Sequence, residues 1–175
     1  MAYFYVYAPF NGANWGQNTY CFNNAPHPSR YYCCPIDIGR PNNDVTPIYF
    51  YGSSNIRSIR VIFDNQVCNS IPGDPWENAL KVELFGQLDA QCYVGALSYS
   101  HVANPITTGT QVYNANYIKL GDASPDTCNC NQNFLCYNGV HVHMERSSNG
   151  ASISLACWAP VYAATTWIYR WSAAC

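Results

Sequence analysis

Hydrophobic and polar residues alternate along much of this chain in short runs, a pattern typical of half-buried β-strands. The runs are rich in β-branched and aromatic residues and are mostly separated by Gly, Pro, Asn or Asp. They cover positions 3–7, 47–51, 58–63, 80–85, 92–99, 111–120, 140–145 and 152–158. Helical periodicity is absent except at positions 75–80, where a proline after Asp74 favours a turn or two of helix. The pattern therefore predicts an all-β, antiparallel protein.

Nothing in the sequence divides the chain into parts. Its 175 residues suit one domain, and there is no internal repeat, low-complexity linker or block of like charges. The Asn- and Cys-rich positions 122–137 are expected to form a long loop. The most apolar region, 153–169, contains Pro160 as well as Ser and Thr, which favours buried strands over a membrane span. We therefore expect a single domain over positions 1–175.

The composition indicates a neutral, polar surface. Charged residues make up only 10% of the chain, whereas tyrosine alone accounts for 15 residues. Such a surface suits sugars or peptides better than phosphates. With 8 Lys and Arg against 10 Asp and Glu, the chain also lacks the positive charge that nucleic-acid binding requires. We therefore exclude nucleic acid as a partner.

Ten cysteines indicate an oxidising compartment. Disulfides at this density persist mainly in secreted and extracellular proteins, and the even count agrees with full pairing. The alternative is a cysteine zinc cluster, but the usual pairs of Cys-x-x-Cys are missing. We expect a secreted protein stapled by disulfides, with Met1 standing in place of a removed leader, and the sequence leaves the connectivity of the cysteines open.

Two of the four histidines, His141 and His143, are two positions apart in a predicted strand. Alternate residues of a strand share one face of the sheet, so this spacing directs both imidazoles to one site. Neutral imidazole is a common zinc ligand and also a base near pH 7. The competing interpretation is a pair of ordinary surface histidines.

A carboxylate between two isoleucines, Asp37, is the second candidate. Its strand-like surroundings favour partial burial, where a charge without a partner costs much free energy. Zinc satisfies that charge, although Arg30 or Arg40 would satisfy it too. Upstream, His27 stands between two prolines and is by itself as well explained as a loop residue.

Taken together, these segments occur in the order typical of lysostaphin-type peptidoglycan endopeptidases. They are Tyr-Ala-Pro-Phe-Asn-Gly at 7–12, Pro-His-Pro at 26–28, Pro-Ile-Asp-Ile-Gly at 35–39, Thr-Pro-Ile-Tyr at 46–49 and Gly-Val-His-Val-His-Met-Glu at 139–145. The remaining histidine, His101, lies in Tyr-Ser-His-Val, which resembles the family's Tyr-x-His-Leu strand. The chain therefore resembles this family over most of its length. The resemblance implies a single antiparallel β-sheet or sandwich domain of the lysostaphin type, also described as duplicated hybrid motif-like.

The resemblance also implies a zinc site. It assigns the metal to His27, Asp37 and His143, and the catalytic roles to His141, as the base for the attacking water, and His101, which orients that water or stabilises the oxyanion. The chain departs from the family in one respect, because His27 and Asp37 are ten positions apart, whereas four is usual. An insert in the connecting loop can still bring both side chains to one metal.

Two hypotheses for function follow. The first is a secreted zinc metalloendopeptidase that cleaves peptide cross-links of bacterial peptidoglycan, which explains why both non-ligand histidines, His101 and His141, are present. The second is a non-catalytic lectin or signalling protein on the same scaffold, binding peptidoglycan or another glycan-bearing cell surface, which explains the disulfides and the neutral Tyr- and Asn-rich surface. The sequence leaves the oligomeric state open.

Overall fold

The computed structural model describes residues 1–10, 15–19, 36–39, 46–63, 78–123, 141–146, 152–153, 161–162 and 167–175. Within these ranges all regular elements are β-strands and every pairing is antiparallel, as the alternating pattern predicts. The strands are β1 (Ala2–Tyr7), β2 (Trp15–Thr19), β3 (Ile36–Gly39), β4 (Thr46–Tyr51), β5 (Ser58–Phe63), β6 (Asn78–Phe85), β7 (Tyr93–Ala103), β8 (Val112–Tyr113), β9 (Tyr117–Ala123), β10 (His141–Arg146), β11 (Ser152–Ile153), β12 (Val161–Tyr162) and β13 (Trp167–Ala173). In this part of the chain no helix has the length and hydrophobicity of a membrane span.

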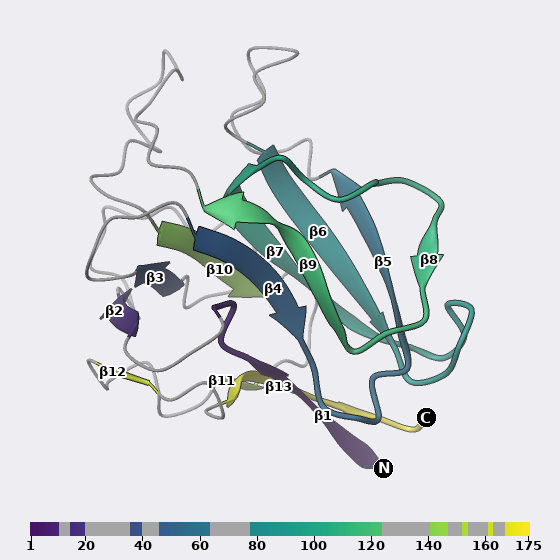
Figure 1. Cartoon of the computed structure of the whole chain (residues 1–175). Helices are drawn as coiled ribbons and strands as arrows, with labels where there is room; N and C mark the ends of the chain where they lie inside the picture. The colour runs from purple at the N-terminus through teal and green to yellow at the C-terminus, as the bar shows by residue number, and fades with distance from the viewer. Residues whose placement is uncertain are drawn as a thin grey trace.

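The strands form two sheets. The larger sheet has ten strands. Eight of them lie side by side in the order β12-β2-β3-β10-β7-β6-β5-β8, and β9 pairs with both β7 and β4. The smaller has the order β1-β13-β11, and its pairing of Ala2 with Ala173 brings the two ends of the chain close together (Figure 1). An isolated bridge between Val6 and Gly52 connects the smaller sheet to the end of β4.

One hydrophobic core lies between these layers. The paired strands β4 and β9 lie in front of β10 and β7 in Figure 1. Strand β4 contributes Ile48 and Phe50, which belong to the same buried cluster as Val82 on β6 and Leu97 on β7. The smaller sheet adds Trp171, which is 1% exposed. The core is thus formed by the inward-facing side chains of strands from both sheets, which is the packing expected of a β-sandwich.

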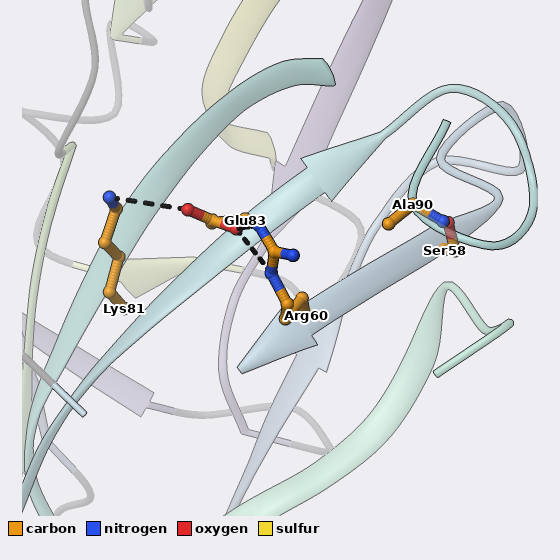
Figure 2. A network of polar contacts seen from close by, with 5 residues as sticks. All are labelled: Ser58, Arg60, Lys81, Glu83 and Ala90. Atoms are coloured by element: carbon orange, nitrogen blue, oxygen red, sulfur yellow. Dashed lines mark hydrogen bonds and ion pairs between the residues drawn. The ribbon is translucent and has the colours of Figure 1, made fainter. Parts of the chain in front are cut away.

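The face of β5 and β6 that points away from the hydrophobic core carries charged residues. Glu83 accepts hydrogen bonds from Nε and Nη2 of Arg60 on the neighbouring strand, and Lys81 lies 3.5 Å from its other oxygen (Figure 2). At the start of β5 the Ser58 hydroxyl accepts a hydrogen bond from the Ala90 amide and donates one to the Gln87 carbonyl. These contacts mark the polar side of the sheet and secure the turn between β6 and β7.

Three expectations from the sequence need correction. Positions 78–80, assigned to a helical turn, belong to β6, because pairing with β7 buries Ala79 and Leu80 and this burial outweighs the local helix signal. The predicted strand 111–120 is two strands, β8 and β9, separated by a turn in which the Ala115 amide bonds the Tyr113 carbonyl. Of the predicted loop 122–137, Asp122 and Ala123 belong to β9, and the remainder lies outside the described residues.

A disulfide joins Cys92, just before β7, to the C-terminal Cys175. It confirms that cysteines of this chain form disulfides and is compatible with an extracellular protein. The other eight cysteines lie outside the described residues. This link closes a loop of 83 residues and fastens the end of the smaller sheet to the larger one.

Candidate functional site

The candidate site lies where β3, β10 and β7 are adjacent in the larger sheet. In the ladder of β10 and β3, His143 is the direct register partner of Asp37. On the other side of β10, His143 pairs with Ser100 of β7. Residues directly opposite each other in an antiparallel ladder are nearest neighbours on one face of the sheet. The fold therefore brings two of the three predicted metal ligands to adjacent positions, although 105 residues separate them in the sequence.

The two predicted catalytic histidines are in contact. The ring centroids of His101 and His141 are 4.9 Å apart and the ring planes meet at 65°, an edge-to-face arrangement. Both side chains are buried, with exposed fractions of 5% and 9%. Such packing restricts both rings, so the pair presents its nitrogen atoms in a fixed relative orientation.

An irregularity in β7 positions His101. Leu80 pairs with Tyr99 and Asn78 pairs with Val102, so Ser100 and His101 together stand opposite a single residue of β6. His101 itself has a φ of 65°, in the left-handed region that few non-glycine residues adopt. A β-bulge of this kind changes the direction of a side chain and is often found beside active sites. Without it, simple alternation along β7 would place His101 on the same face as Tyr99 and the core.

The two faces of β7 and β10 differ sharply in polarity. On one face Val142 and Met144 are fully buried beside Leu97 and Tyr99 in the hydrophobic core. On the other, β7 presents two buried serines, Ser98 and Ser100, opposite Glu145 and His143 respectively. Buried hydroxyls in a sheet are costly unless they hydrogen-bond, so their clustering beside the histidines indicates a polar site and not additional core.

The two serines are the part of this site that the sequence interpretation missed. Leu, Ser, Tyr and Ser at 97–100 alternate apolar and polar residues, and this period of two already indicates a strand with one polar face. What the pattern alone does not reveal is that this polar face is buried.

The structure describes two of the three positions assigned to the zinc site. His27 lies outside the described residues, and at positions 37 and 143 the backbone register is what the structure describes. Among the described side chains no group of three or more His, Cys, Asp or Glu residues is placed to hold a metal ion. The residue types nevertheless suit zinc, since two imidazoles and a carboxylate form one of its common catalytic ligand sets.

Comparison with known proteins identifies no relative: no family model, curated protein or solved structure matches this chain.

Proposed function

We propose that this chain is a secreted zinc metalloendopeptidase of the lysostaphin type that cleaves peptide cross-links of bacterial peptidoglycan. The observation that carries the proposal is the register of β3, β10 and β7, which makes His143 the neighbour of Asp37 while His141 contacts His101. Four of the five residues that the sequence resemblance selects thus lie on three adjacent strands. The order of the sequence motifs supports the same family independently of this geometry.

In this proposal His27, Asp37 and His143 would hold the zinc ion. A set of three protein ligands is typical of catalytic zinc sites, whereas structural zinc sites usually have four. When bound, zinc supplies Lewis-acid polarisation of the scissile carbonyl and lowers the pKa of water from about 15.7 towards about 7.

In the proposed reaction the two histidines act as a general base and as a hydrogen-bond donor. His141, two positions from the proposed ligand His143 on β10, would accept a proton from the attacking water and return it to the nitrogen of the scissile bond, which then leaves as an amine. His101, in edge-to-face contact with His141, donates a hydrogen bond to the oxyanion that develops on the scissile carbonyl. Because burial and mutual packing restrict both rings, little reorganisation is needed during the reaction.

The test combines metal analysis with hydrolysis of purified peptidoglycan, followed as release of amino groups. Wild-type protein is expected to contain about one zinc ion per chain, as a single three-ligand site requires. His143→Ala should lose both zinc and hydrolysis. His141→Ala should retain zinc while hydrolysis falls by about 10²- to 10⁴-fold, the usual contribution of a general base.

A matched control is Tyr93→Ala, which removes an exposed ring from the other end of β7 and should change neither readout. Zinc-loaded wild-type protein that releases no amino groups rejects the enzyme. Retention of zinc by His143→Ala rejects the proposed ligand set. If wild-type protein binds cell walls without hydrolysing them, the alternative of a non-catalytic lectin or signalling protein takes its place.

A further inference from the structure

Four tyrosines from three strands form a continuous row of rings on the outer side of the molecule. We call these four residues, Tyr7 of β1, Tyr49 and Tyr51 of β4, and Tyr117 of β9, the tyrosine strip. Ring centroids are 4.8 Å apart for Tyr7 and Tyr51, 5.5 Å for Tyr51 and Tyr117, and 5.0 Å for Tyr117 and Tyr49. The last pair is stacked, with an angle of only 6° between the ring planes.

The strip is separate from the hydrophobic core. Along β4 the inward residues Ile48 and Phe50 are fully buried, whereas Tyr49 and Tyr51 occupy the alternate, outward positions. Tyr51 is 36% exposed and Tyr117 is 45% exposed. Tyr7 and Tyr49 are partly exposed. Core packing therefore does not account for this arrangement, and a contiguous group of partly or fully exposed aromatic rings often marks a binding surface.

The aromatic surface continues along the smaller sheet. On β1, Tyr5 lies next in the outward series after Tyr7, and its ring centroid is 5.8 Å from that of Trp167 on β13. Arg170 stacks over Trp167 at 5.5 Å from the ring centroid. Aromatic rings on the outward faces of β9, β4, β1 and β13 thus extend from the larger sheet to the smaller one.

The chemistry of the strip is neutral and amphipathic. The charged residue that faces Tyr49 in the ladder, Lys119, places its ammonium 2.8 Å from a carboxylate oxygen of Asp122, so the two charges offset each other. Partial burial raises the pKa of Tyr7, and electrostatic interaction with the nearby Tyr51 and Tyr5 raises it further. Burial and the neighbouring tyrosines likewise raise the pKa of Tyr117. The strip therefore offers apolar ring faces and phenolic hydroxyls that can donate or accept hydrogen bonds, and the hydroxyls of Tyr7 and Tyr117 stay protonated at neutral pH.

These properties match a sugar polymer better than other partners. A nucleic acid requires clustered cations, which the strip lacks. A pyranose presents C–H groups on its face and hydroxyls on its rim, so it can stack on a ring while bonding a tyrosine hydroxyl. Tyrosine also loses little conformational entropy on binding because its ring moves about only two side-chain torsions, and here strands hold the rings in place.

We infer that the tyrosine strip binds the glycan strand of bacterial peptidoglycan and so holds the protein on the polymer from which the cross-linking peptides branch. The identity of this glycan rests on the proposed function, while the presence of a sugar-binding surface rests on the strip alone. Catalysis and attachment are then separate properties of the chain, carried by different residues.

The experiment measures binding to peptide-free glycan strands, prepared from peptidoglycan with an amidase. Tyr51→Ala and Tyr117→Ala should each weaken binding about fivefold to tenfold, in line with the usual contribution of one aromatic contact. Tyr93→Ala is the matched control, since Tyr93 is 52% exposed but lies outside the strip. Circular dichroism spectra and the thermal unfolding midpoint of each variant check that the fold is retained.

A second readout separates this inference from the proposed function. Hydrolysis of a short soluble cross-link peptide does not require the glycan, so Tyr51→Ala should leave its rate unchanged while glycan binding falls. Glycan binding by wild-type protein without peptide hydrolysis supports the strip and rejects the enzyme. Undiminished glycan binding by folded Tyr51→Ala and Tyr117→Ala, or wild-type binding to cross-linked peptidoglycan but not to peptide-free strands, overturns the inference.

Discussion

Two buried tyrosines provide a sharp test of how the core is stabilised. Tyr99 and Tyr169 both belong to the hydrophobic core and both have side chains with 0% exposure. The Tyr169 hydroxyl donates a hydrogen bond of 2.9 Å to the Met144 carbonyl of β10. The Tyr99 hydroxyl is buried and has no hydrogen-bond partner within the part of the chain that the structure describes. Replacing each by phenylalanine removes only this oxygen, so the two variants differ mainly in the hydrogen bond lost.

We expect opposite effects on the free energy of unfolding. Tyr169→Phe should destabilise the protein by about 1–2 kcal/mol, because it removes a buried hydrogen bond and weakens the pairing of the Met144 carbonyl. Tyr99→Phe should be neutral or stabilising by up to about 1 kcal/mol, because burying a hydroxyl that makes no hydrogen bond costs free energy. The variants should therefore differ by about 2 kcal/mol, or about 1 M in the midpoint of urea unfolding for an m-value of about 2 kcal/mol per M.

The burial of Tyr99 also predicts that the free energy of unfolding depends on pH in the alkaline range. Burial raises the pKa of Tyr99, whereas in the unfolded chain tyrosine titrates near its usual value of about 10. Above about pH 10 the unfolded state consequently binds fewer protons than the native state, and the free energy of unfolding falls by about 1.4 kcal/mol per pH unit. Tyr99→Phe removes this contribution and should flatten the decline between about pH 10 and pH 11.

Urea titrations of the wild type and both variants at pH 7 and above pH 10 measure these differences. A loss of 1 kcal/mol or more for Tyr99→Phe at pH 7, matching the loss for Tyr169→Phe, would refute the reasoning, because it would mean that the Tyr99 hydroxyl makes a stabilising bond. An unchanged alkaline slope in Tyr99→Phe would refute the account of its ionisation.

Two further predictions concern the backbone and the disulfide. Gly121→Ala should lower the free energy of unfolding by about 2–3 kcal/mol. A β-carbon at this position would lie 2.5 Å from the Ala103 carbonyl oxygen, which belongs to a paired strand and cannot easily move. A urea midpoint equal to that of the wild type would contradict this prediction. Replacing Cys92 and Cys175 together by alanine should cost about 4.5 kcal/mol, the chain-entropy value for releasing a loop of 83 residues in the unfolded state. Urea unfolding without reductant measures it, and an unchanged midpoint would show that the link adds no stability.

Local pattern explains why much of the fold could be predicted from the sequence. The strand at 58–63 has the predicted bounds, because alternating apolar residues bounded by turn residues carry their own signal. The sequence did not predict the split of 111–120, because the division depends on a turn that lets β9 pair with both β7 and the sequence-distant β4. Likewise Asn78–Leu80 extend β6 because β7 is there to pair with them.

For the candidate site, the sequence alone determined the residue types and one spacing. The His-x-His strand, the Asp37 strand and the neutral, tyrosine-rich composition are local properties, readable without a fold because the side-chain period of a strand is fixed at two. Only the tertiary structure decided that Asp37 and His143 are cross-strand neighbours and that a bulge in β7 turns His101 towards His141. It also decided that tyrosines from β1, β4 and β9 meet in one row, and which partner Cys92 takes. These outcomes depend on register between distant segments, which is set by burial of the whole core and is not encoded in any single stretch of the chain.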